Sequence, residues 1–200
     1  MATAVVYAAL QRQSARQVIE VGFWFSDVTY ELPRLRAEGM EPLTLAEQET
    51  IRRLARSEVE HAFAGLRVRV TDSRRAHYRV AVEQVFKGRL QGAAGLSRTL
   101  IGAGGAGAVN FLVVANLAVV QAPPDATRAT IVEGIGRGLG RSAVHELAHQ
   151  MVPNVNLHDS TDPESYEYGS ADRFSHFYGI ERWGPIGPVL TRRYGSRGVR

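Results

Sequence analysis

Residues 145 to 149 read His-Glu-Leu-Ala-His, and they lie near the end of a stretch from about residue 126 to residue 151 that is expected to form a helix. On a helix, residues four apart lie one turn above each other on the same face. His145 and His149 therefore offer two imidazole nitrogens to one ion, and Glu146 lies beside them. We expect this helix to carry the functional site.

The residue types in this motif suit one catalytic Zn²⁺. A catalytic zinc ion needs a third protein ligand and one open position. Glu146 is the candidate general base, because its carboxylate is placed to take a proton from water that attacks a metal-polarised carbonyl. The chain has no cysteine, so the remaining ligand must be a His, Asp or Glu.

The third ligand is expected downstream of the helix. His158 follows His149 by nine residues, and it is our first candidate because it is the only histidine shortly after the helix. A carboxylate is the alternative: Asp159, Asp162, Glu164 or Glu167. Asp159 has a second possible role, as an acceptor that orients an imidazole from behind.

Two segments carry a resemblance to a known family. HELAHQMVPNVNLHD (145–159), followed by DPESYEYGSADR (162–173), resembles the zincins and, within them, the metzincin clan of metallopeptidases. The resemblance implies a zinc peptidase with a twisted mixed sheet packed on helices and an edge strand beside the substrate cleft. It also implies His145, His149 and His158 as zinc ligands, and a tight turn below the metal that commonly contains Met.

The sequence departs from that pattern at two points. The clan places its third histidine six residues after the second and has a Gly between them, so the turn here must be longer, and Pro153 is expected to shape it. The turn below the metal aligns with residues 165–168, which contain no Met. A Tyr either replaces Met as the packing floor, or Tyr166 or Tyr168 acts at the metal as a ligand or oxyanion donor. We take Tyr168 as the catalytic candidate.

Upstream, the patterns predict a mixed α/β domain spanning residues 1–200. Alternating residues predict strands over 18–25, 66–70 and 78–82, and Trp24 is expected in the core. Thr44 and Glu47 form a capping box that begins a helix ending near Gly65. The apolar run 110–120 is interpreted as a buried strand, and the glycine-rich segment 102–107 as a flexible loop bordering the cleft.

Several other residues have mainly structural interpretations. Glycines at 134, 136, 138 and 140 lie inside the long helix, where close approach by neighbouring backbone would offset their cost. We expect surface positions for His61 and His77, a packed position for His176, and an ion pair between Asp172 and Arg173. Three residues suggest a closing segment wrapped on the body: Trp183, Pro185 and Pro188.

Composition excludes several function classes. The 200 residues are 44% hydrophobic and 22% charged, as in a globular domain. No apolar run has the length of a membrane span, so a membrane is not an expected partner. The net charge is +4, and the basic residues are scattered apart from a tail at about 191–200, so nucleic acid is not an expected partner either. The first ten residues lack a basic n-region, so we expect no signal peptide, and secretion would require a missing precursor segment.

We therefore expect a peptide or protein substrate and hydrolysis of peptide bonds. The alternatives are a zinc amidase or toxin-like protease with a single target, and a non-catalytic binding domain that is stabilised by zinc. Glu146 argues against the last alternative, because a purely structural zinc needs no base.

Overall fold

The computed structural model describes residues 18–37, 39, 41–100, 104–152 and 156–195. Its strands are β1 (Ile19–Ser26), β2 (Val68–Thr71), β3 (Tyr78–Glu83), β4 (Gly95–Leu100) and β5 (Gly104–Asn110). Its helices are α2 (Pro33–Ala37), α3 (Leu45–Ala62), α4 (Phe111–Val120), α5 (Arg128–Met151), α6 (Phe174–Tyr178) and α7 (Ile186–Tyr194), with short 3-10 turns η1 (Gly88–Leu90) and η2 (Leu157–Asp159). None of the described helices is long and apolar enough to cross a membrane.

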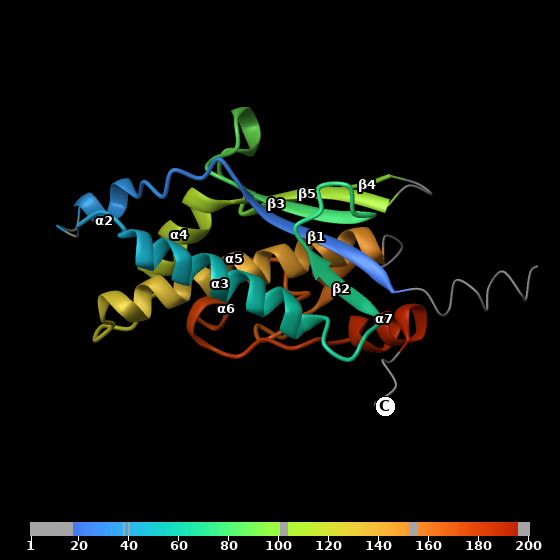
Figure 1. Ribbon diagram of the computed structural model, residues 1–200. Helices are drawn as coiled ribbons and strands as arrows, with labels where there is room; N and C mark the ends of the chain where they lie inside the picture. Colours follow the sequence, from blue (N-terminus) through green and yellow to red (C-terminus); the bar gives the residue numbers. More distant parts are fainter. Residues whose placement is uncertain (1–17, 38, 40, 101–103, 153–155, 196–200) are drawn as a thin grey trace, which may run out of the picture.

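The five strands form one mixed sheet in the order β2-β1-β3-β5-β4. All neighbouring pairs are parallel except β4 and β5, which are antiparallel and put β4 at an edge. In Figure 1 the long helices α3 and α5 run side by side along one face of this sheet, and α5 contacts β3, β5 and β4. The expected mixed sheet packed on helices is confirmed.

The glycine-rich segment is a strand and not a loop, which corrects our interpretation of residues 104–107; residues 101–103 lie outside the described part of the chain. A Cβ at Gly105 would lie 2.4 Å from Cγ of Gln150, and one at Gly107 would lie 2.9 Å from its Nε2. Gln150 of α5 in turn exchanges two hydrogen bonds with the backbone of Arg79 in β3. The glycines therefore let α5 pack closely on the sheet.

The apolar run after β5 is the helix α4, so the strand expected over 110–120 is wrong. Asn110 is the N-cap, and its side chain accepts a hydrogen bond from the backbone N–H of Val113. A continuous apolar run has no period that separates a buried strand from a buried helix. Here the cap at Asn110 and the ten-residue length favour the helix.

The capping box of α3 is confirmed, because Thr44 and Glu47 exchange side-chain and backbone hydrogen bonds. Gly65 follows the helix with a φ of 81°, a left-handed conformation that suits glycine. The glycines of α5 divide between two faces: Gly136 and Gly140 meet α3, and the pair at 134 and 138 meets the aromatic rings of α6. The expected close approach by neighbouring backbone is confirmed for Gly136 and Gly140, whereas the other two glycines meet side chains.

The expected burial of Trp24 and the expected start of the basic tail both need correction. Trp24 is only partly buried, since its ring faces the guanidinium of Arg74 at 5.9 Å and not the core. Residues 191–194 belong to α7, where Tyr194 is buried, so the basic tail begins later than expected. Residues 196–200, and residues 1–17 where a signal peptide was considered, lie outside the described part of the chain.

Candidate metal centre

Three imidazole rings converge at the C-terminal half of α5. His145 and His149 lie on α5, and His158 lies in η2, which buried Leu157 anchors to the core. The Nε2 atoms are 3.1 Å apart for 145–149, 3.1 Å for 145–158 and 3.2 Å for 149–158. The structure thus brings together the three histidines that the sequence selected, despite the unusual nine-residue spacing.

The protonation of His145 is set by its second nitrogen. Its Nδ1 lies 2.7 Å from the backbone carbonyl oxygen of Tyr166, which can only accept, so Nδ1 carries the proton. The Nε2 atom of the neutral ring is then a bare lone pair directed at the other two rings. With Nε2 of His145 bare, at most two N–H groups are available for the three Nε2–Nε2 contacts, so hydrogen bonding alone does not account for the arrangement.

The donor set fits a zinc ion. Nitrogen ligands at about 2.0–2.1 Å from a tetrahedral zinc lie about 3.3 Å from one another, close to the separations found here. Burial lowers the pKa of both His145 and His149 to about 4, so these rings are neutral at neutral pH, as metal ligands must be. The hydrogen bond from His145 to a carbonyl is the usual outer support of a ligating imidazole.

The carboxylates considered as third ligands have other partners. Asp159 accepts a hydrogen bond from the side chain of Asn156, and Asp162 pairs with Arg182, as does Glu164. Glu167 is buried and accepts hydrogen bonds from two backbone N–H groups, those of residues 184 and 186. Among the described residues, the group able to hold an ion consists of the three histidines.

Glu146 faces the cavity beside the histidines and is only 7% exposed. A Cβ on Gly95 of β4 would lie 2.3 Å from Oε1 of Glu146, so the carboxylate occupies the space that this glycine leaves. Burial raises the pKa of Glu146 to about 8. The carboxyl group therefore lies in a poorly solvated position, where a proton is readily held.

Strand β4 is tied to the same helix by two hydroxyl groups. Ser97 donates to the backbone carbonyl of Glu146, and Thr99 donates to that of His149. The edge strand and the face of α5 that carries His145 and His149 are thus held in a fixed relation. No pattern in the sequence predicts this strand.

The two tyrosines of the turn after η2 have different positions. Tyr166 is buried, and its ring packs on Trp183 with centroids 5.0 Å apart, so its side chain belongs to the hydrophobic core. Tyr168 is half-buried and lines the cavity. The guanidinium of Arg173 lies over the Tyr168 ring at 4.9 Å.

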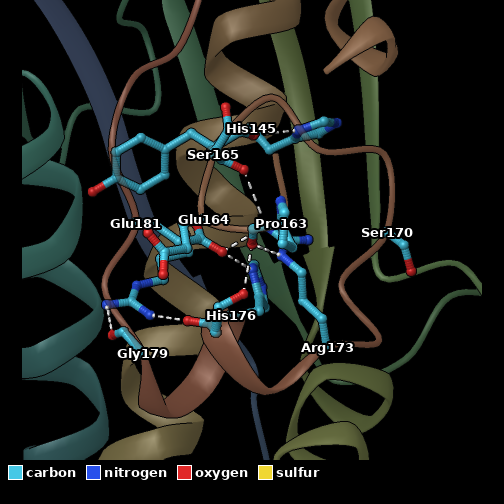
Figure 2. Close-up of polar contacts among 12 residues, drawn as sticks. His145, Pro163, Glu164, Ser165, Ser170, Arg173, His176, Gly179 and Glu181 are labelled. Carbon is cyan, nitrogen blue, oxygen red and sulfur yellow. Dashed lines mark hydrogen bonds and ion pairs between the residues drawn. The ribbon is translucent and has the colours of Figure 1, made fainter. Parts of the chain in front are cut away.

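Behind this turn lies a buried polar cluster. Arg173 pairs with Glu181 at 2.5 Å, and His176 contacts the same carboxylate oxygen at 2.9 Å (Figure 2). The expected ion pair of Asp172 with Arg173 is therefore wrong; Asp172 instead accepts from Gln121. Glu181 replaces it because its carboxylate is fully buried and needs a charged partner.

The remaining histidines and the closing segment lie as expected. His61 and His77 are exposed, and His176 is packed against Ser142 and Glu181. Trp183 donates its indole N–H to the backbone carbonyl of residue 62, which fastens the segment before α7 to the end of α3. Pro153, to which we assigned the shape of the turn after α5, lies outside the described residues.

Comparisons with known proteins were made by family, sequence and structure. No family model matches the chain, and no curated protein matches its sequence. A solved structure titled as the GM1 bound form of the ECX AB5 holotoxin is similar to it with a TM-score of 0.46 and 16% identity, over 90% of this chain and 82% of that chain. A likeness this distant carries no argument about either fold family or activity.

Proposed function

We propose that this chain is a zinc-dependent metallopeptidase of the metzincin-like zincin type. The observation that carries the proposal is the triangle of Nε2 atoms with Glu146 in the adjoining cavity. Three neutral nitrogen donors with a carboxylate beside them form the set that a hydrolytic zinc site needs.

His145, His149 and His158 would hold the ion. When bound, zinc supplies Lewis-acid chemistry, which acidifies water and polarises a substrate carbonyl. Glu146 is placed to accept a proton from the attacking water and to pass it to the amine of the leaving peptide. Its buried position favours holding that proton between the two events.

Strand β4 supplies a means of orienting the substrate. It lies at the edge of the sheet, with β5 as its strand neighbour, and α5 packs beside it. An extended peptide can add to a sheet edge through backbone hydrogen bonds, which position its chain without regard to sequence. Tyr168, which lines the cavity, is available as a hydroxyl donor to the oxyanion that forms during hydrolysis.

A structural zinc site is the main rival. Structural sites are usually closed by four protein ligands, whereas here the cluster has three histidines, and two of them, His145 and His158, line a cavity of about 280 Å³. His158 is itself exposed, so the site is accessible. This openness favours a catalytic site over a stabilising one.

The test is metal content followed by activity. The purified chain should contain about one zinc per molecule, and it should cleave members of a broad peptide library. Dialysis against a chelator should remove the zinc and abolish peptide cleavage, and added zinc should restore the metal content and the cleavage. Cleavage that survives complete zinc removal would reject the proposal, and zinc binding without cleavage of any peptide would favour the amidase, single-target or structural alternatives.

A further inference from the structure

The cavity beside the three histidines is sized for one substrate side chain. Its volume is about 280 Å³, at the lower limit of small-molecule pockets. Much of its wall is formed by small residues from two segments, 93–95 before and at the start of β4 and 169–171 after the tyrosine turn. These residues leave the space open, so the larger polar residues of the lining determine what it accepts.

Arg173 is the permanent cation of that lining. Its Nε donates to the carbonyl of Pro163, and its Nη2 donates to the carbonyl of Ser165 and to Glu181 (Figure 2). Nη1 donates to none of the described residues, although the side chain is only 10% exposed. A guanidinium has donors on all three nitrogens, so Nη1 retains hydrogen-bonding capacity on a side chain that lines the cavity.

The surroundings of Arg173 leave its charge only partly compensated at the cavity. Glu181, its counter-ion, is fully buried, does not line the cavity, and shares one carboxylate oxygen between Arg173 and His176. The acidic group of the cavity lining, Glu146, packs against Gly95, and no ion pair between it and Arg173 is found among the described residues. The ring of Tyr168 covers the guanidinium and holds it in place.

We propose that this cavity binds a carboxylate of the substrate and that Arg173 is the residue that selects it. The inference rests on the proposed peptidase function, and it specifies the substrate class as peptides with an acidic group next to the scissile bond. The carboxylate comes either from an Asp or Glu side chain or from the end of the peptide chain. Both sources present the same planar acceptor to a guanidinium.

The first experiment compares isosteric peptides on the zinc-loaded protein. Peptides blocked at both ends carry Glu or Gln at each position flanking the cleaved bond, and a second pair ends next to that bond with a free carboxylate or an amide. In one of the two pairs, the charged member should have a kcat/KM about tenfold to a hundredfold higher than the neutral member. The pair that shows this difference identifies whether the carboxylate comes from a side chain or from the end of the peptide. Equal rates in both pairs, or faster cleavage of the neutral members, would overturn the proposal.

Two sets of variants test the residue. Arg173→Gln should abolish the preference for the charged peptide. Because Arg173 also holds two backbone carbonyls and is the counter-ion of buried Glu181, Ala171→Asp and its matched control Ala171→Asn test the same cavity without altering those bonds. The aspartate variant should lose the preference and the asparagine variant should keep it. If the aspartate variant keeps the preference for the charged peptide, the substrate carboxylate is bound outside this cavity.

A binding measurement separates this inference from the proposed function. Zinc-loaded Glu146→Gln protein is titrated with the same peptide pairs by calorimetry, which requires no cleavage. Tighter binding of the charged member by about tenfold, lost in the Arg173→Gln background, would support the cavity even if no hydrolysis is found. Equal binding of charged and neutral peptides would overturn the inference, whatever the activity.

Discussion

His145 donates its Nδ1–H to the backbone carbonyl of Tyr166 over 2.7 Å, so α5 and the turn after η2 are joined through a ring that also faces the proposed ion. The bond fixes both the tautomer and the orientation of the imidazole. Because the acceptor is a carbonyl, the backbone of the turn positions the ring, while the Tyr166 side chain packs against Trp183.

Glu146→Gln should keep the fold and the zinc and reduce peptide hydrolysis about a hundredfold or more, because the amide cannot accept the proton from water. Activity and metal content are measured on the same preparation. Glu133→Gln is the control, since Glu133 lies on the exposed part of the same helix and pairs only with Arg137 in an i,i+4 bridge. Wild-type activity in Glu146→Gln would remove Glu146 from the mechanism.

His158→Ala should weaken zinc binding by several kcal/mol, because one of three nitrogen donors is removed. Asp159→Asn should change the affinity by less than about tenfold, since Asp159 contacts Asn156 and no imidazole. Titration of zinc into both apo variants against a competing chelator gives the two affinities. A larger loss in Asp159→Asn than in His158→Ala would show an aspartate-type site.

Glu47→Gln should destabilise the protein at pH 7 by about 1 to 2 kcal/mol, because Glu47 both caps α3 and binds Arg128 at the start of α5. The hydrogen bond from Arg128 lowers the pKa of Glu47 to about 2. A lowered acid pKa contributes stability that is present above the unfolded value of 4.5 and is lost as the pH falls toward 2.

Urea unfolding of wild type and Glu47→Gln between pH 7 and pH 2.5 tests this dependence. The difference between the two proteins should narrow as the pH falls below about 4.5. Glu60→Gln, which breaks an exposed i,i+4 pair with Arg56, is the control and should have a small effect at all pH values. A difference that stays constant down to pH 2.5 would contradict the assigned ion pair.

Gly140→Ala should destabilise the protein by about 1 to 3 kcal/mol, although alanine is the better helix former. The added Cβ would lie 2.5 Å from the backbone carbonyl oxygen of Ala55 in α3, and a backbone atom cannot move aside cheaply. Gly134→Ala is the comparison, because its new Cβ meets the ring of Tyr178, a side chain. Equal thermal stability of wild type and Gly140→Ala would show that α3 and α5 are less closely packed.

The sequence predicted the helix of the site and its histidines because their spacing is local: four residues along a helix determine which side chains share a face. His158 was identified as the nearest histidine, and its position among the other two is set by η2. The mixed sheet was also predicted, through the alternating patterns of β1, β2 and β3.

The errors lie where tertiary packing overrides local pattern. Glycines in β5 have no side chains whose polarity could alternate, so the sequence pattern does not predict a strand. Their close packing on Gln150 is a tertiary contact that only the structure shows. β4 was missed, and its pairing depends on β5. Arg173 was assigned to its sequence neighbour Asp172, whereas its partner Glu181 is brought to it by the chain folding back after α6.

Gly95→Ala gives the sharpest test of how β4 and Glu146 are related. The added Cβ would lie 2.3 Å from Oε1 and 2.8 Å from Cδ of Glu146, so the carboxylate must move from its position in the cavity. The three atoms nearest to this Cβ all belong to Glu146 and none to a histidine, so zinc should stay bound while kcat falls by about tenfold or more, as expected when a catalytic group is displaced by about an ångström. Gly92→Ala is the matched control, because a Cβ there meets nothing within 4 Å. It should leave both zinc content and kcat unchanged. If Gly95→Ala cleaves peptides as fast as Gly92→Ala does, the carboxylate of Glu146 does not act from the position that the structure gives it.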